Sequence, residues 1–234
     1  MMGKCLKLMW FVGSSKINNP GFCNTNRAKQ TISFGKTSGE VGTNVFIEPE
    51  VEELALTKLG LKPDTAPTQI ISRDRHAEVV ALMAVNGATL ARIATNIRLL
   101  GETDMGEVRE PFDPEAQQGS SAMPHKRNTE LTERVVGLNR RIRSSVGEEL
   151  DAVISWLERD ISHSSTERFT FPDIFGCLSY AAKLTTFVTD GLVINSEKML
   201  KNIDKTFGSI YSSRLLNALL ETGNISRTEA YELV

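Results

Sequence analysis

The amino-acid sequence predicts an all-α protein, a bundle of long and mostly antiparallel helices. Two stretches, residues 76–100 and 131–150, carry apolar residues at helical spacing over many turns. Aromatic residues make up only 6% of the 234-residue chain, which is low for a β-sandwich. The sequence contains no strand pair joined by a hairpin turn and no internal repeat. We therefore expect helical elements throughout, with an apolar flank that partner subunits cover.

Composition narrows the class of protein and its compartment. A hydrophobic content of 40% and a net charge of −2 describe a globular chain with a sizeable core and no basic excess for nucleic acid. Three cysteines, Cys5, Cys23 and Cys177, are far apart, without metal-ligand spacing, and favour a reducing compartment. The apolar stretch 6–12 is too short for a secretory signal, and we expect no transmembrane helix. The chain is thus expected in the cytoplasm or an organelle, with no membrane partner.

Residues 1–33 are expected to be irregular, and a glycine-rich segment follows them. Residues 1–33 are rich in Asn, Gly, Ser and Lys and show no sustained period. Residues 34–43 contain three glycines within eight positions, but they lack the order of a phosphate-binding P-loop. Small residues there allow either close backbone approach near a site or tight packing between helices. The sequence leaves these two interpretations open.

A short helix over 49–59 is predicted by Pro49 at its start, glutamates in its first turn and Gly60 after its end. A loop over 62–72 then leads to the long helix. His76 stands at the head of that helix and could serve as an acid or base. Its neighbours are two arginines and an aspartate, so a structural salt-bridge network is the better interpretation of His76.

The two long helices have different faces. The first has two apolar stripes, which indicates burial in a bundle or at a subunit interface. The stripes are formed by Val80, Met83, Ala84, Gly87, Leu90, Ala91, Ala94 and Ile97, and by Val79, Leu82, Ile93 and Leu100. The second has one apolar stripe, formed by Leu131, Val135, Leu138, Ile142, Val146 and Leu150. Its arginines (Arg134, Arg140, Arg141 and Arg143) are interpreted as a solvated or inter-subunit face.

The remaining helices are predicted from start and stop signals. One is expected from Phe171 to about residue 193, and Asn195 or Ser196 caps the next. Gly208 ends that helix before another over 209–222, which Gly223 terminates. Ser226 and a glutamate three residues later form a capping box for the last helix.

Two stretches carry the chemistry. The loop 119–128, GSSAMPHKRN, begins with a flexible Gly and contains a rigid Pro turn. Its hydroxyls, cation and amide suit an anionic substrate with carboxylates: Ser120, Ser121, Lys126 and Asn128. The stretch 156–168, WLERDISHSSTER, is rich in hydroxyls and has Arg159 and Arg168 near its ends. It is typical of a phosphate or carboxylate site, and a generic Ser-rich loop is the alternative.

Together these stretches resemble the aspartase/fumarase superfamily, and Pro-His-Lys-Arg-Asn in the loop resembles its adenylosuccinate lyase family in particular. The resemblance runs from Phe34 to Val234. It implies a non-family leader (1–33) and a partial central helical domain with the start of the C-terminal region (34–234), a superfamily-type bundle incomplete at both ends. One position departs, because Thr129 stands where the family has Pro. We expect a changed helix start, since Thr can cap a helix, and an intact loop.

The resemblance also implies a reaction and its residues. Such lyases release fumarate by β-elimination from succinyl-AMP, giving AMP, and from the succinylated aminoimidazole carboxamide ribotide. By resemblance, Ser120 is the base. The substrate-binding residues are Gln69, Ser121, Lys126 and Asn128, with Arg159, Ser164 and Arg168 for the nucleotide. A small-molecule nucleotide is the expected ligand, no cofactor or metal is expected, and the expected assembly is a homotetramer whose sites are shared between subunits.

The general acid of the reaction is missing from this list. The family takes a histidine from a region that would precede Phe34, and none of His76, His125 and His163 lies in that motif. Two hypotheses stay open. Either the chain belongs to an active lyase whose acid comes from another chain, or it is a catalytically silent helical fragment or pseudo-enzyme that acts only in assembly or binding.

Overall fold

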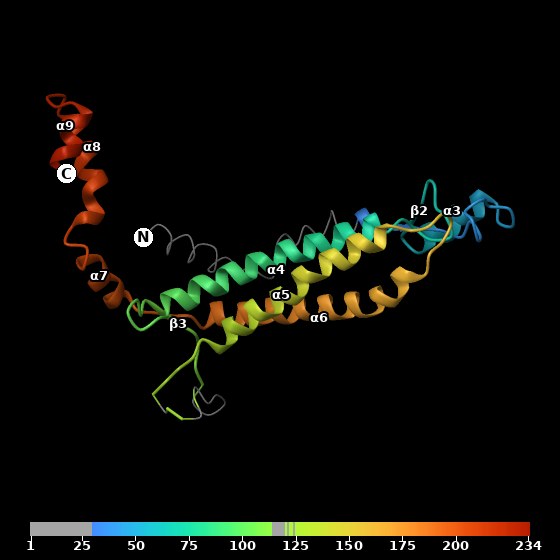
Figure 1. Ribbon diagram of the computed structural model, residues 1–234, viewed down its shortest axis with the longest axis horizontal. Helices are drawn as coiled ribbons and strands as arrows, with labels where there is room; N and C mark the ends of the chain where they lie inside the picture. The colour runs from blue at the N-terminus through green and yellow to red at the C-terminus, as the bar shows by residue number, and fades with distance from the viewer. Residues whose placement is uncertain (1–29, 114–119, 121, 124) are drawn as a thin grey trace.

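Three long helices form the body of the molecule. The computed structural model describes residues 30–113, 120, 122, 123 and 125–234. Helices α4 (Asp74–Leu100), α5 (Glu130–Val153) and α6 (Ser162–Asp190) lie side by side and alternate in direction (Figure 1). The predicted bundle of long antiparallel helices is confirmed. Most of the leader, residues 1–29, lies outside the described residues, and residues 30–32 are helical.

Smaller elements lie at the two ends of the bundle (Figure 1). Near the start of α4 are β1 (Phe34–Gly35), α3 (Pro49–Lys58) and β2 (Lys62–Pro63). Near its end are β3 (Val108–Arg109) and β4 (Val193–Ile194). The expectation that every element is helical was wrong in detail, because β1 pairs with β2 in parallel and β3 with β4 antiparallel. Two-residue strands have no alternating pattern long enough to read in a sequence.

The core follows the apolar stripes along the bundle. All eight residues of the first α4 stripe are buried, as are Val79 and Ile93 of the second. Ile142 on α5 and Ile174 on α6 have no exposed surface and pack in one cluster with Val80 and Met83 of α4. Burying one such side chain contributes about 1.5–3 kcal/mol. The α5 stripe fades at its end, where Leu150 is 57% exposed.

Helix α4 is more apolar than we expected. By length and composition alone it passes as a membrane span, and it is the one candidate among the described residues. However, 56% of its most apolar window is buried inside the bundle, mainly against α5. Such burial is typical of the core helix of a globular protein, whose apolar stripes face neighbouring helices.

Helix α6 begins nine residues before the predicted position. It starts at Ser162 and contains Pro172, and it ends at Asp190. The Asp160 carboxylate accepts a 2.7 Å hydrogen bond from the Ser162 backbone nitrogen and so satisfies a free donor of the first turn. Proline was interpreted as a helix start, but it only removes one hydrogen bond inside a helix that packing sustains. Half of the Ser-rich stretch is therefore helix and not loop.

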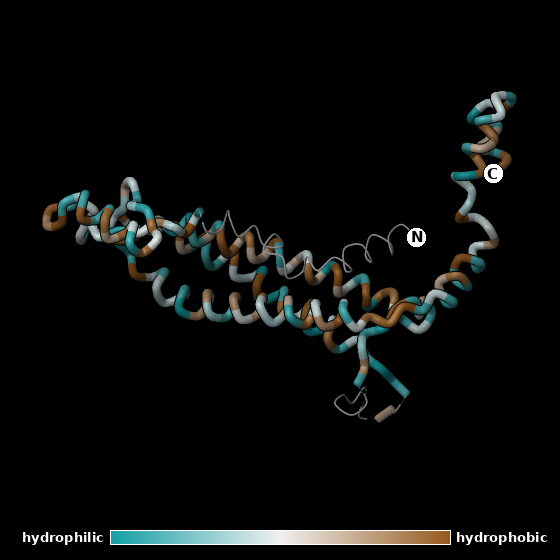
Figure 2. The backbone as a smooth tube through the Cα atoms, turned by 180° about the vertical axis from the view of Figure 1, so that it is seen from behind, coloured by the Kyte–Doolittle hydropathy of each residue, from teal (hydrophilic) through white to brown (hydrophobic). Residues whose placement is uncertain are grey.

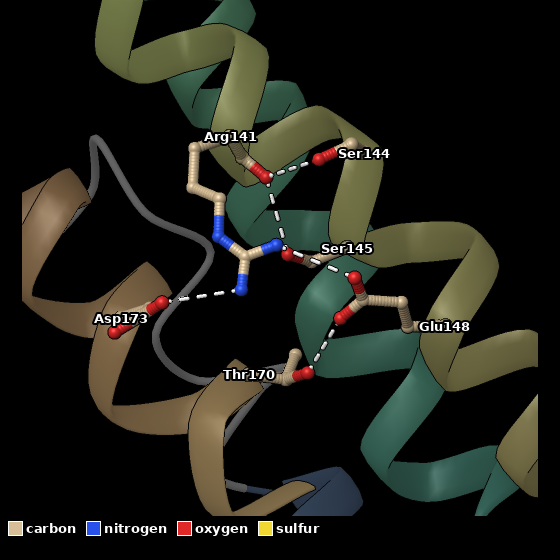
Figure 3. A network of polar contacts seen from close by, with 6 residues as sticks. All are labelled: Arg141, Ser144, Ser145, Glu148, Thr170 and Asp173. Atoms are coloured by element: carbon tan, nitrogen blue, oxygen red, sulfur yellow. Dashed lines mark hydrogen bonds and ion pairs between the residues drawn. The ribbon is translucent and has the colours of Figure 1, made fainter. Parts of the chain in front are cut away.

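The arginine face of α5 is only partly solvated. Arg141 lies 3.1 Å from Asp173 of α6 and 3.3 Å from Glu148 of its own helix (Figure 3). Glu148 in turn accepts a 2.7 Å hydrogen bond from the Thr170 hydroxyl of α6. The network joins α5 to α6. Because Arg141 is about one-third exposed, each ion pair contributes less than about 1 kcal/mol.

The C-terminal segments extend away from the bundle. They comprise α7 (Ser196–Asp204), η2 (Ser209–Tyr211), α8 (Ser212–Glu221) and α9 (Arg227–Leu233). Of the two predicted cap candidates Asn195 and Ser196, Asn195 caps α7, and the Ser226 capping box is confirmed. Helices α7 and α8 have no buried residues, and apolar residues occur all along this arm (Figure 2). Apolar side chains are exposed here, for example Phe207 with an exposed fraction of 97%, which agrees with the expected apolar flank for partner subunits.

Candidate active site

Ser120 is held by the backbone of its own loop. Its Oγ accepts hydrogen bonds from the backbone nitrogens of Ala122 at 3.3 Å and Met123 at 3.2 Å. The backbone nitrogen of Lys126 donates a 3.0 Å hydrogen bond to the Met123 carbonyl oxygen, and this bond closes a turn. Two amide dipoles thus point at the one oxygen that the resemblance assigns as base. Ser121, also assigned to this site, lies outside the described residues, as do Gly119 and Pro124.

Lys126 and Asn128 follow on the exposed part of the loop. Asn128 lines a pocket of about 450 Å³ at the start of α5, together with Arg109 and Arg127. The Arg127 guanidinium stacks over the Phe112 ring at 4.1 Å. Guanidinium groups and an amide in one hollow can bind a carboxylate. Three glutamates, Glu110, Glu130 and Glu133, line the same pocket, so its charges are mixed.

A glutamate caps the helix that follows the loop. Glu110 accepts hydrogen bonds from the backbone nitrogens of Leu131 at 3.2 Å and Thr132 at 2.8 Å, and from the Thr132 hydroxyl. Thr129 stands at the N-cap of α5, but its side chain makes no capping bond. The suggestion that Thr129 caps this helix was wrong, because Glu110 already occupies the free donors. No local spacing in the sequence indicates a cap from twenty residues upstream.

The second group of predicted residues lies at the start of α6. Gln69 donates from its backbone nitrogen to the Glu158 carbonyl at 3.2 Å, which brings its loop beside Arg159. The Arg168 Nε donates to the Ser164 Oγ at 3.4 Å, one helical turn away. Arg159 and Arg168 are exposed, and Gln69 and Ser164 are half-buried. The structure thus gathers these four residues at one end of the bundle.

The glycine-rich segment supports the loop that carries Gln69. Gly42 has φ +75°, and a Cβ added there would lie 2.1 Å from the Pro67 carbonyl oxygen. The Lys36 ammonium donates to the carbonyls of Gly39 and Thr68, and burial lowers the pKa of Lys36. Of the two interpretations of this segment, close backbone approach is the one observed.

His76 belongs to a charged cluster beneath this group, in agreement with its interpretation as structural. Its Nδ1 lies 3.1 Å from Glu167, and the Arg73 Nε lies 2.8 Å from the same oxygen, Oε1. Glu149 of α5 is also in the cluster and has no exposed surface. Sequence analysis missed Glu149 and Glu167, although helical spacing does place Glu149 on the buried face of α5, seven residues after Ile142. The other two histidines differ in environment, His125 being exposed and His163 buried.

The two groups of predicted residues lie at opposite ends of the bundle. The Ser120 loop precedes α5, and Arg159 follows it (Figure 1). The 24 residues of α5 correspond to about 36 Å of helix at 1.5 Å per residue. A nucleotide-sized molecule cannot span that distance. Within one chain, the residues that the resemblance assigns to one site therefore lie in two separate groups.

Sequence comparisons agree with the resemblance. A family model described as lyase matches residues 19–144, a range that begins before Phe34. Adenylosuccinate lyases are similar to this chain: that of Thermotoga maritima is 47% identical over 208 residues, and that of Synechocystis sp. is 48% identical over 208. In both cases the match covers 89% of this chain and 48% of the relative. The chain thus spans about half the length of the curated relatives it matches.

Solved structures show the same fold. The 3-carboxy-cis,cis-muconate lactonizing enzyme of Pseudomonas putida superposes with a TM-score of 0.74 and 24% identity, over 89% of this chain and 46% of that one. A fumarate lyase of Mesorhizobium sp. superposes with a TM-score of 0.66 and 24% identity, over 79% and 39%. At such identities the likeness concerns the fold alone. Since the family model covers more than half of the sequence, the chain belongs to this lyase family, and its similarity to adenylosuccinate lyases is specific within it.

Proposed function

We propose that this chain contributes half-sites to an adenylosuccinate lyase, which eliminates fumarate from succinyl-AMP and from the succinylated aminoimidazole carboxamide ribotide. The observation that carries the proposal is the pair of backbone amides at the Ser120 Oγ, at 3.2 and 3.3 Å. The relatives named adenylosuccinate lyase support the same reaction class.

Ser120 would act as the base. Removing a proton from the carbon beside a carboxylate requires a stronger base than a neutral serine, so the alkoxide must be stabilised in place. Two amide donors aimed at Oγ supply that stabilisation, and removal of one such donor from an oxyanion site typically costs about 10²–10³-fold in rate. The Lys126 ammonium, a few residues along the same loop, adds positive charge. The elimination then expels the purine nitrogen and leaves fumarate.

The remaining residues would bind the two ends of the substrate. Lys126 and Asn128, with Ser121, suit the succinyl carboxylates. Gln69, Arg159, Ser164 and Arg168 suit the nucleotide, with guanidinium groups for its phosphate. Because these groups lie at opposite ends of the bundle, we infer that each complete site combines the Ser120 loop of one chain with the Arg159 end of another. A homo-oligomer, a tetramer by resemblance, provides that arrangement and also covers the exposed apolar flank.

The alternative is a silent assembly protein with the same fold. In either case the acid is not among the residues assigned here, since none of His76, His125 and His163 lies in the family's acid motif. The described residues place His76 in an ion-pair cluster, where its ring is already engaged with Glu167. We expect a cytoplasmic location under both hypotheses. Only the first hypothesis expects the assembled protein to turn over substrate.

The deciding experiment measures fumarate release from succinyl-AMP by the purified chain. Ser120→Ala removes the base, and Ser213→Ala on α8 serves as the matched serine control. We expect turnover in the control and none in Ser120→Ala. Folded wild-type chain without turnover would mean that the residues present here do not make a complete site by themselves.

The shared site has its own test. Ser120→Ala and Arg168→Ala are each expected to be inactive alone. Co-expression produces mixed oligomers in which some sites combine an intact Ser120 loop with an intact Arg168 end, so part of the activity should return. Absence of any recovery, in oligomers shown to contain both variants, would mean that each site is built from one chain.

A further inference from the structure

A carboxylate without a partner is buried where the three long helices meet. Glu149 of α5 has no exposed surface, and among the described residues neither of its carboxylate oxygens has a hydrogen-bond partner. A buried ionised carboxylate left unpaired costs several kcal/mol. The folded chain therefore requires something that neutralises Glu149.

Charged groups from all three helices surround Glu149. From α6, Glu167 offers an oxygen within 4.8 Å of a Glu149 oxygen, and His76 of α4 offers a ring nitrogen within the same distance. Arg73, at the head of α4, lies 2.8 Å from Glu167. On α5 itself, Glu148 is engaged with Arg141 and Thr170. The single arginine of this cluster is thus paired directly with Glu167 and offsets the charge of Glu149 only in part.

We propose that the cluster is a proton-binding site, in which Glu149 is held as the neutral acid and directs its proton toward the Glu167 carboxylate. A neutral acid supplies the donor that the Glu167 carboxylate can accept, and it removes the repulsion between the two carboxylates. The arrangement resembles carboxyl pairs that share one proton because both cannot ionise at close range.

A proton fits the geometry better than a divalent metal ion does. Zinc binds His and carboxylate ligands at about 2.0–2.2 Å in a tetrahedron, so its ligand atoms lie about 3.3 Å apart. The three ligand atoms here are spread over up to 4.8 Å, and the Arg73 guanidinium beside Glu167 repels a second cation. A proton requires only a small movement of one carboxyl group.

The bound proton would hold the first turns of α6 against α4 and α5. Glu167 lies on α6 between Ser164 and Arg168, so repulsion from an ionised Glu149 acts on the turn that presents them. This consequence for ligand binding rests on the proposed function. The proton-binding site itself does not, because it depends only on burial and charge.

The sign of the pH dependence follows from the direction of the shift. Burial raises the pKa of Glu149 from 4.5 to about 7, with a further rise from the Glu167 charge that Arg73 partly offsets. Between these values the folded chain binds a proton that the unfolded chain has released. The contribution of Glu149 to the free energy of unfolding is therefore fully present below about pH 4.5, and it is lost as the pH rises through about 7.

The test compares the full chain with Glu149→Gln, whose amide imitates the neutral acid, and with Glu53→Gln on α3, an exposed glutamate, as the control. Urea midpoints are measured between about pH 5 and about pH 9. We expect the wild-type and E53Q midpoints to fall across this range while that of E149Q changes less, so that E149Q is the more stable at high pH. Parallel curves for wild type and E149Q would overturn the proposal.

A second measurement does not depend on any variant folding. Carboxyl carbon NMR of the glutamate-labelled wild-type chain should show one glutamate that titrates near neutrality, and the same chain titrated with zinc should show no stoichiometric binding. Glutamates that all titrate in the ordinary acidic range would contradict the proposal. Zinc binding that E149Q abolishes would also contradict it, and would identify a metal site instead. Neither result depends on lyase activity, so failure here is distinguishable from failure of the proposed function.

Discussion

The backbone nitrogen of Gln69 donates a 3.2 Å hydrogen bond to the carbonyl oxygen of Glu158. This bond joins two loops that are far apart in the sequence and places Gln69 beside Arg159. The position of this hydrogen bond depends on the segments next to the two loops. The glycine-rich segment packs against the Gln69 loop, and the start of α6 follows the Glu158 loop. Changes in either support should therefore disturb the same end of the bundle.

Gly42→Ala should destabilise this end strongly. Its φ of +75° is unfavourable for alanine, and the new Cβ would meet the Pro67 carbonyl oxygen at 2.1 Å. Gly39→Ala is the matched control, because its φ of +88° is equally unfavourable but nothing lies within 4 Å of its Cβ. Each change pays about 1–2 kcal/mol for the backbone, and the clash should add at least about 1 kcal/mol at Gly42. Urea denaturation measures the free energy of unfolding of both variants. Equal losses of stability would show that the Pro67 loop moves to accommodate the new Cβ.

Ile142→Ala should test the centre of the bundle. Ile142 has no exposed surface and packs against α4 and α6. Its truncation should cost about 2–5 kcal/mol in the free energy of unfolding. Leu150→Ala on the same helix is the control, since Leu150 is 57% exposed and should change stability by about 0.5 kcal/mol or less. A cost at Leu150 that matched Ile142 in the isolated chain would contradict the observed packing.

The start of α5 should depend on Glu110 and not on Thr129. Glu110→Ala removes the acceptor of two backbone nitrogens and should cost about 1–2 kcal/mol. Thr129→Pro should be nearly neutral, because the φ of Thr129 is −82° and its side chain makes no capping bond. Thermal unfolding of both variants provides the measurement. A large loss in Thr129→Pro alone would mean that the Thr129 N–H has a role that we have not recognised.

Arg73→Gln should move the titration of Glu149. The Arg73 charge lowers the pKa of Glu149, so its removal should raise that pKa above its value of about 7 in the wild-type chain. The pH at which stability is lost should shift upward accordingly. NMR titration of the glutamate carboxyls detects the shift directly. Arg143→Gln, an exposed arginine further back on α5, is the control and should leave the titration unchanged.

Local patterns were sufficient for the long elements and for the caps. The first apolar stripe of α4 is buried throughout, because the period of 3.6 repeats over 27 residues, whereas Leu82 and Leu100 of the second are not fully buried. Asn195 and Ser226 were identified as caps because their partners lie three residues away. The start of α6 was missed because Pro172 is a strong local signal that tertiary packing overrides. The cap by Glu110 was missed because its donors lie more than twenty positions away.

The sequence by itself determined the helical class, the family and the identity of the residues that carry charge and hydroxyl groups. These properties depend on residue types at short spacings along one chain. Only the tertiary structure decided where those residues lie, and it places Ser120 and Arg159 at opposite ends of α5 while it buries Glu149 beside Glu167. The reason is physical: the direction of each helix, and the neighbours of each buried charge, follow from packing between elements distant in sequence.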